Sequence, residues 1–319
     1  MSPASLPFIR FEPIYQTRVW GGRQLAQRFG RSLPDPALPY GESWEISARE
    51  EADSRVAGGP LDGRTLRELW ADSGLRRAIF GEDAPESDRF PLLFKILDAR
   101  EDLSIQVHPP ASVAPELGGE PKTEVWYIAD AAPGAMLYVG VREGVDEARF
   151  REALATGEVA DCVHAVPVVK GQHLFIPSGR LHAIGAGLLI YEIQQNSDTT
   201  YRVFDWNRPG IDGKSRDLHV EESLRCIDFG DVEPTLDEAR DALLCECEHF
   251  RLERHRLAEG APLAEAVRGR FAIVTVVGGG IGDGTTRFGE GAFFLVPPDG
   301  GGGLQAEGEA EVLVTTWGK

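Results

Sequence analysis

The chain has 319 residues and a formal net charge of −18 at pH 7, with a sequence pI near 4.8. This length is enough to bury one large core or two smaller ones without disulfides. The acidity argues against nucleic acids and anionic membrane surfaces as partners, because both would repel the protein. The opening MSPASLPFIRF lacks an apolar stretch of signal-peptide length, and no window is apolar enough to span a bilayer. We therefore expect a cytoplasmic protein.

The first part of the chain predicts short strands followed by one helix. Residues 1–60 contain brief apolar and aromatic runs broken by Gly and Pro, which is typical of strands and loops. Apolar side chains at helical spacing then predict a short helix between Asp62 and Phe80, with Asp62 or Thr65 as its cap.

Strands dominate the rest of the sequence. Between Phe90 and Trp206, several runs rich in Val, Ile, Tyr and Phe predict strands, and VDEARFREALATG predicts one helix among them. An acidic, turn-rich connection over 210–240 leads to a second β-rich block. The strings GQHLFIPSGRLH and GAFFLVPPDGGG repeat the same strand and turn in the two blocks. The sequence therefore predicts a mainly β fold with two antiparallel jelly-roll barrels in one chain and a few short helices.

Four side chains that bind metals stand in or beside separate predicted strands: Gln106, His108, Glu124 and His182. Gln106 and His108 are two positions apart, so they project from the same face of a pleated strand. Two imidazoles, one carboxylate and one amide oxygen suit Zn²⁺ and also Mn²⁺, Fe²⁺ or Co²⁺. With a single charged ligand, the site would keep the positive charge that a Lewis acid needs. We expect one divalent ion per chain, and Zn²⁺ is the first choice.

The spacing Gly171-x5-Pro177-x-Gly179-x2-His182 fits the second half of the cupin metal motif. The earlier residues are similar to its first half, with glutamine in place of the first histidine. In the second β-rich block the glycines 300–303 occupy the place of His182, and glycine has no side chain to bind a metal. We therefore expect residues 1–225 to form a metal-binding catalytic barrel with N-terminal strands and a short helix, and residues 226–319 to form a metal-free block.

Long strings of the sequence resemble the mannose-6-phosphate isomerase family in its short bacterial form. They are VWGG, YGESWEIS, FPLLFKILDAREDLSIQVHP, KTEVWYIAD and KGQHLFIPSGRLHAIGAGLLIYEIQQNSDTTYRVFDWNR, and the similarity runs between residues 10 and 225. The resemblance implies metal ligation by the four residues above. It also implies a second polar cluster, to which Ser104, Lys122, Glu192, Arg202 and Arg208 correspond.

Strand alternation supports this cluster. Ser104 shares a strand face with Gln106, and Lys122 shares one with Glu124, so both should line the cavity that holds the metal. In so acidic a chain, Lys122, Arg202 and Arg208 around one pocket would form the basic island that a phosphate needs. The alternative for the arginines is ordinary ion pairing at the surface. The tryptophans of VWGG and YGESWEIS are interpreted as packing anchors.

The expected reaction interconverts mannose 6-phosphate and fructose 6-phosphate through a cis-enediol. Such a reaction needs a base near both carbons and positive charge near both oxygens. We assign the base to Glu192, because it is the remaining cavity carboxylate, and the positive charge to Arg202 or Lys122 beside the metal. Ser104, Lys122 and Arg208 are the expected substrate contacts. A mononuclear metal oxygenase and a noncatalytic sugar-binding cupin stay open as alternatives, and the sequence does not decide the oligomeric state.

Overall fold

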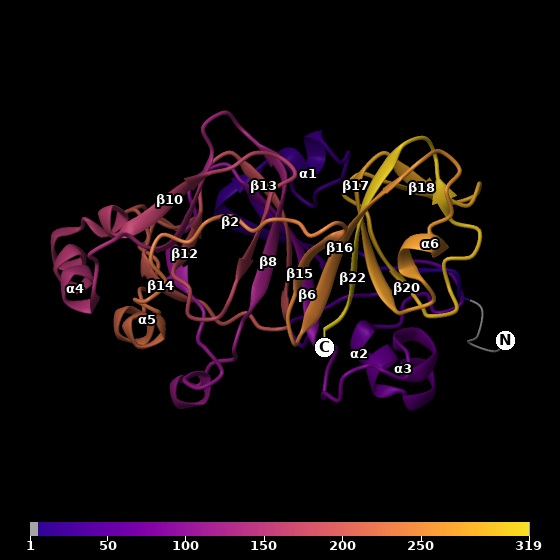
Figure 1. Cartoon of the computed structure of the whole chain (residues 1–319), viewed down its shortest axis with the longest axis horizontal. Coiled ribbons are helices and arrows are strands. Elements are labelled where there is room, and N and C mark those ends of the chain that lie inside the picture. Colours follow the sequence, from indigo (N-terminus) through magenta and orange to yellow (C-terminus); the bar gives the residue numbers. More distant parts are fainter. Residues whose placement is uncertain (1–5, 319) are drawn as a thin grey trace. The chain divides into compact units, whose positions relative to one another are not determined.

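The computed structural model describes residues 6–318 and divides into two compact units, each built from separate stretches of sequence (Figure 1). The central unit combines Tyr15–Ser43 with Lys95–Asp237. The C-terminal unit combines the residues up to Ile14 with Trp44–Phe94 and everything from Glu238 onward. The predicted division at residue 225 remains a prediction, because compactness alone groups the N-terminal stretches differently. No helix in the described part of the chain is long and apolar enough to cross a membrane.

Two antiparallel sheets form the central unit. The first has six strands in the order β11 (His173–Ile176), β8 (Glu124–Ala131), β13 (Leu188–Gln195), β6 (Leu92–Ala99), β2 (Ile14–Gly22) and β3 (Tyr40–Ile46). The second has five strands in the order β10 (Val163–Pro167), β9 (Met136–Val141), β12 (His182–Ile184), β7 (Ile105–Val107) and β14 (Tyr201–Phe204). Side chains of both sheets meet in one apolar core that includes Trp126, Ile190, Leu137 and Ile184. This is the sandwich expected of a jelly roll.

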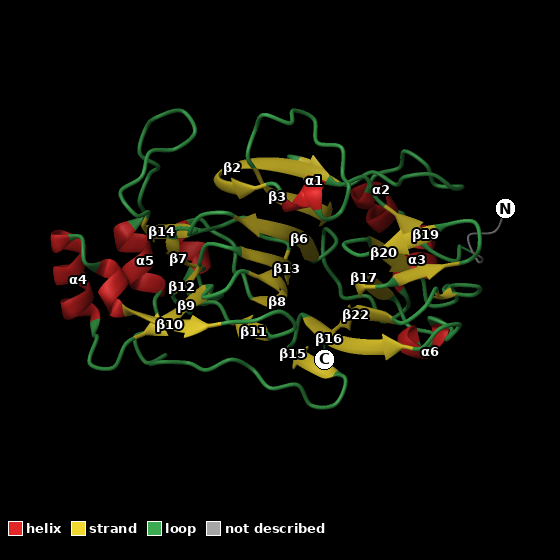
Figure 2. Ribbon diagram, turned by 90° about the horizontal axis from the view of Figure 1, so that it is seen from above, coloured by secondary structure: helices red, strands yellow, loops and turns green. Residues whose placement is uncertain are grey.

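Helices α4 (Glu147–Thr156) and α5 (Val220–Cys226) lie beside the five-stranded sheet (Figure 2). They pack Phe150 and Leu224 against a second core that includes Val107 and Val203. The predicted helix in VDEARFREALATG is therefore confirmed as α4, and Asp146 caps it by accepting a hydrogen bond from the backbone of Arg149. A one-turn helix, α1 (Gln24–Gln27), follows β2.

The C-terminal unit has its own sheet and core. Its six strands lie in the order β1 (Ile9–Arg10), β20 (Phe293–Val296), β17 (Ala272–Gly278), β22 (Ala310–Trp317), β16 (Phe250–Leu257) and β15 (Leu243–Glu246). Smaller sheets comprise β19 (Arg287–Gly289), β18 (Gly280–Gly282) and β21 (Gln305–Ala306), and β4 (Ala48–Arg49) with β5 (Ala52–Asp53). The chain is therefore mainly β, as predicted.

The helix predicted between Asp62 and Phe80 is two helices, α2 (Leu66–Ala71) and α3 (Ser73–Phe80), and a third short helix, α6 (Ala264–Val267), belongs to the same unit. Thr65 caps α2 with a capping box. Asp72 ends this helix in an extended conformation and caps α3 through the backbone of Gly74 and Leu75. The apolar spacing does not reveal the break at Asp72, because both helices have buried apolar side chains.

Close backbone approach explains the glycines that follow Trp20. A Cβ on Gly21 would lie 2.5 Å from the backbone nitrogen of Gly41, and a Cβ on Gly22 would lie 2.1 Å from Oδ1 of Asp98. Gly41 in turn lies against the ring of Trp20. Glycine at positions 21 and 41 lets β2 and β3 approach each other closely, and Gly22 leaves room for the side chain of Asp98 on β6. The approach places Arg18 and Trp20 of β2 at the wall of the cavity described below.

Candidate metal and substrate site

The structure brings His108, Glu124 and His182 together inside the central unit. His108 follows β7, Glu124 opens β8 and His182 opens β12, so the three come from both sheets of the sandwich. All three are buried, and their ligand atoms lie within 4.8 Å of one another. Nε2 of His108 is 3.5 Å from Oε2 of Glu124, and Nε2 of His182 is 3.7 Å from Oε1. This cluster has the residue types and the spacing to hold a metal ion.

Backbone carbonyls fix the orientation of both imidazoles. Nδ1 of His108 donates to the carbonyl of Thr199 at 3.0 Å, and Nδ1 of His182 donates to the carbonyl of Arg180 at 2.8 Å. Because a carbonyl only accepts, each Nδ1 carries the proton and each Nε2 keeps its lone pair. Burial lowers the pKa of His182, and burial together with the charge of Lys122 lowers that of His108 to about 3. Both rings are neutral and present Nε2 toward Glu124, as metal-binding histidines do.

Glu124 and Gln106 complete the donor set. Both carboxylate oxygens of Glu124 are buried without a hydrogen bond, and among the described residues only Oε2 has a close cation, Nζ of Lys122. A buried carboxylate with capacity left on its oxygens fits a further cation. Gln106 is paired with His182 across β7 and β12, and its amide nitrogen donates to Nε2 of that histidine at 3.3 Å. Rotating the Gln106 amide by 180° would exchange its nitrogen and oxygen, so that the oxygen could act as a metal ligand. The residues present therefore fit one divalent ion.

Lys122 lies against this cluster as a buried cation. Its Nζ is 2.9 Å from Oε2 of Glu124 and donates to Nε2 of His108 at 3.2 Å. Burial lowers the pKa of Lys122, but the negative charges of Glu124 and Glu192 outweigh it and raise the pKa above its ordinary value. The same pairing holds the pKa of Glu124 well below its usual range although burial opposes this. Lys122 thus stays charged and is suited to an electrostatic role.

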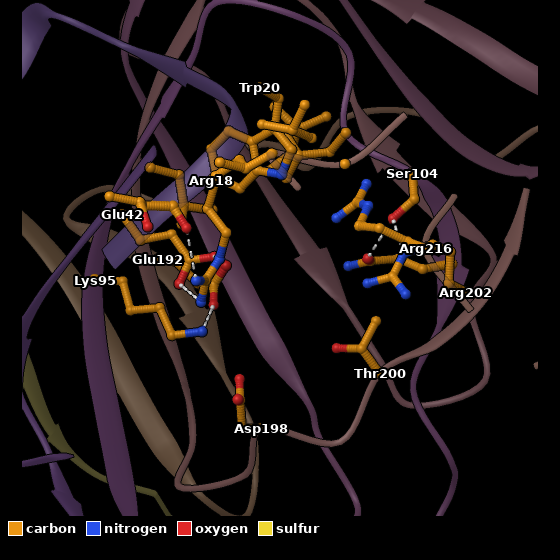
Figure 3. A pocket seen from close by; sticks show the side chains of 18 of the residues that line it. Arg18, Trp20, Glu42, Lys95, Ser104, Glu192, Asp198, Thr200, Arg202 and Arg216 are labelled. Atoms are coloured by element: carbon orange, nitrogen blue, oxygen red, sulfur yellow. Dashed lines mark hydrogen bonds and ion pairs between the residues drawn. The ribbon is translucent and has the colours of Figure 1, made fainter. Parts of the chain in front are cut away.

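A cavity of about 680 Å³ adjoins the cluster (Figure 3). Five residues predicted from the sequence line it: Ser104, Gln106, Lys122, Glu192 and Arg202. Arg208 does not belong to its lining; its guanidinium pairs with Asp205 at 3.0 Å. The expectation that Arg208 faces the cavity therefore finds no support, because its side chain takes the ion-pairing alternative. Arg216 lines the cavity instead.

Glu192 lies on β13 between two lysines. Its Oε1 is 3.4 Å from Nζ of Lys95 and 3.7 Å from Nζ of Lys122, and all three side chains are buried. Burial raises the pKa of Glu192, and the two lysines reduce the shift without cancelling it. A carboxyl with a raised pKa in a cavity has the properties of a general base.

The argument that assigned Glu192 by exclusion needs correction, because three more carboxylates line the cavity: Glu42, Asp198 and Asp212. Glu42 forms a two-pronged ion pair with Arg18, with Nε of the arginine 2.7 Å from Oε1. Asp198, at the bottom of Figure 3, and Asp212 are both exposed. Among these four carboxylates, only Glu192 combines deep burial with two lysine neighbours.

The known proteins to which the chain is similar point in one direction. Residues 8–136 match the family model described as "Phosphomannose isomerase type I, catalytic domain". The chain is 36% identical over 322 residues to "Mannose-6-phosphate isomerase ManA" of Bacillus subtilis, covering 96% of this chain and 97% of that protein. The chain belongs to the mannose-6-phosphate isomerase family. It is also 41% identical to the mannose-6-phosphate isomerase of Streptococcus mutans, over 69% of each chain.

A solved structure of the mannose 6-phosphate isomerase from Bacillus subtilis superimposes on this one with a TM-score of 0.80 at 30% identity, covering 97% of this chain and 99% of that chain. Membership in the mannose-6-phosphate isomerase family confirms the predicted cupin jelly-roll class and the enzyme class. The family model covers the segment with Gln106, His108 and Glu124 and ends before His182, whereas the relative from Bacillus subtilis spans nearly the whole chain.

Sequence reasoning missed several residues that line the cavity of this isomerase. They are Arg18, Trp20, Glu42, Lys95, Asp198, Thr200, Arg216 and His219. Lys95 had a usable signal, because a lysine inside the apolar run FPLLFKIL is unusual for a buried strand. Trp20 packs in the core, as predicted, and also reaches the cavity. No sequence pattern indicated Arg216, because it lies in the long connection between β14 and α5.

Proposed function

We propose that this chain interconverts mannose 6-phosphate and fructose 6-phosphate in this cavity. The observation that carries the proposal is the buried His108–Glu124–His182 cluster beside a cavity that holds both a buried carboxylate and unpaired positive charge. The relatives named above support the choice of substrate. The fold alone would not, because cupin barrels serve many reactions.

Gln106, His108, Glu124 and His182 would hold one divalent ion. Two neutral imidazoles with one carboxylate favour Zn²⁺ among the metals that this set accepts. When bound, the ion would supply a Lewis acid that polarises the oxygens at C1 and C2 of the sugar. The carbonyls of Thr199 and Arg180 keep both rings in the tautomer that binding requires.

Glu192 is the proposed base that moves the proton between C2 and C1. Its oxygen Oε1 accepts no hydrogen bond and lies between Lys95 and Lys122 at the cavity wall. The carboxylate can therefore take a proton from carbon without first breaking a hydrogen bond. The raised pKa lets it return that proton to the neighbouring carbon.

Lys122 and Arg202 are the proposed cations for the charge that develops on the two sugar oxygens. Lys122 stays protonated beside Glu124, and Arg202 donates to Ser104 at 3.2 Å on the other side of the cavity (Figure 3). Charged donors that are already in place need no rearrangement when the enediol forms. Ser104 and Arg202 together also offer hydrogen bonds to a phosphate.

A coupled assay tests the proposal. The purified protein, loaded with one equivalent of Zn²⁺, is given mannose 6-phosphate, and fructose 6-phosphate is detected as it forms. Glucose 6-phosphate and unphosphorylated mannose serve as comparison substrates. The proposal predicts rapid conversion of mannose 6-phosphate and much slower conversion of the other two. Tight sugar phosphate binding without conversion would instead show a noncatalytic binding protein.

A further inference from the structure

One carboxylate holds two arginines at the edge of the cavity. Asp205 is buried, and its oxygens accept hydrogen bonds from Nε and Nη2 of Arg216 at 2.6 and 2.5 Å. The same side chain accepts from Nε and Nη2 of Arg208 at 3.2 and 3.0 Å. The two guanidinium groups differ in position, because Arg216 lines the cavity and Arg208 does not.

Arg202 and Arg216 bring two positive charges to the part of the cavity beside Asp205. Among the described residues, Arg202 hydrogen-bonds only uncharged groups, namely Oγ of Ser104 and the carbonyl of Asp217. Burial lowers the pKa of Arg202, and the positive charge of Arg216 is the next contribution in the same direction. Arg202 thus brings a guanidinium with no carboxylate partner among the described residues to the cavity, next to Arg216, whose partner Asp205 is shared with Arg208.

Both cavity arginines keep donors for a ligand. Arg216 uses Nε and Nη2 for Asp205, and Arg202 uses Nε and Nη1 for Ser104 and Asp217. Within the described residues, Nη1 of Arg216 and Nη2 of Arg202 hydrogen-bond nothing. Figure 3 shows the two guanidinium groups side by side near Ser104. Such an arrangement matches the planar, multiply charged oxygens of a phosphate.

The connection that carries Arg216 is braced locally. The backbone of Gly210 donates to the carbonyl of Lys214 at 2.6 Å, and Pro209 pairs with Ser215 in an antiparallel bridge. Gly210, Ile211 and Asp212 of the same connection also line the cavity. Asp205 therefore holds the side chain of Arg216, and these backbone contacts hold the connection that carries it.

We propose that Arg216, with Arg202 and Ser104, binds the phosphate of the substrate, and that it is the residue by which this site selects phosphorylated over unphosphorylated sugars. Asp205 is a positioning residue that orients the guanidinium group of Arg216 toward the cavity. Arg208 pairs with the same carboxylate but does not contact the substrate. This assignment rests on the proposed function. It differs from the sequence-based expectation, which placed Arg208 at the phosphate.

Matched variants test the assignment. Arg216→Gln and Arg208→Gln each remove one arginine from Asp205, but only the first removes a cavity cation. Orthophosphate binding to the zinc-loaded protein is measured by calorimetry, and KM and kcat are measured with mannose 6-phosphate. Loss of one charge-assisted contact should weaken orthophosphate binding and raise KM by about 10-fold or more in Arg216→Gln, with kcat and metal content little changed. Arg216→Lys should recover part of the loss, because it keeps the charge without the fork.

Arg208→Gln should keep both constants within about threefold of the wild type, since Arg208 does not line the cavity and Asp205 keeps its pair with Arg216. The assignment is overturned if Arg216→Gln binds orthophosphate as the wild type does, or if only Arg208→Gln loses binding. A wild-type protein that binds orthophosphate through Arg216 yet forms no fructose 6-phosphate would support the phosphate site and refute the proposed function.

Discussion

Replacing Glu192 by glutamine separates the chemistry of this site from its stability. Glutamine keeps the size of the side chain and removes its basicity, so kcat should fall by about 10²–10⁴-fold, the usual contribution of a general base. At about 1.36 kcal/mol per factor of ten, this corresponds to roughly 2.7–5.4 kcal/mol of activation free energy. Metal content should stay at the wild-type value, because Glu192 is not among the proposed ligands.

The same substitution also has a structural cost. Lys95 and Lys122 lie 3.4 and 3.7 Å from Glu192, and all three are buried. Losing the negative charge between them should destabilise the fold by about 3 kcal/mol, near the lower end for a broken buried ion pair. Domains commonly have 5–15 kcal/mol of stability, roughly, so the variant should still fold. Urea unfolding measures this cost separately from kcat.

Two comparison variants make the result decisive. Glu152→Gln removes an exposed carboxylate on α4 and should leave kcat and stability nearly unchanged. Asp198→Asn removes an exposed carboxylate of the cavity. If Glu192→Gln is folded, holds its metal and keeps a near-normal kcat while Asp198→Asn loses it, the base is Asp198 and the reasoning from burial is wrong.

Two further predictions concern the metal cluster and Asp98, a buried residue of β6 that accepts a hydrogen bond from the backbone of Gln24. His108→Ala should lose stoichiometric metal together with activity, and elemental analysis showing the same metal content as the wild type would contradict the ligand assignment. Burial raises the pKa of Asp98 from 3.8 to about 6, so its favourable contribution to stability is present below pH 3.8 and lost as the pH rises through about 6. The free energy of unfolding of the wild type relative to Asp98→Asn should therefore fall by about 3 kcal/mol over this pH range, as measured by urea unfolding, and a constant difference would exclude the raised pKa.

The sequence was most informative where a strand carries two functional residues. The spacing of Gln106 and His108, and of Lys122 and Glu124, determines which side chains share a face, and the structure brings all four together with His182. These are local relations with a period of two, and they hold although His108 lies just after β7 and Lys122 just before β8. Their roles in catalysis remain predictions.

Positions that depend on long connections could not be predicted in the same way. Arg208 and Arg216 are both basic residues near the metal motif and both pair with Asp205, so only the path of the connection between them decides which one lines the cavity. The break between α2 and α3 has a similar cause, because the apolar face continues across Asp72 while the backbone does not. The two compact units could not be predicted from the order of elements along the chain, because each unit is formed by contacts between distant segments.

Titration of the metal-free protein with Zn²⁺ tests the central claim most directly. Fructose 6-phosphate formation from mannose 6-phosphate is followed after each addition, at a protein concentration well above the dissociation constant. A single site formed by His108, Glu124, His182 and Gln106 predicts that the rate rises linearly and levels off at one equivalent per chain. Full activity in protein shown by elemental analysis to contain no metal, or no fructose 6-phosphate at any metal content, would contradict the account.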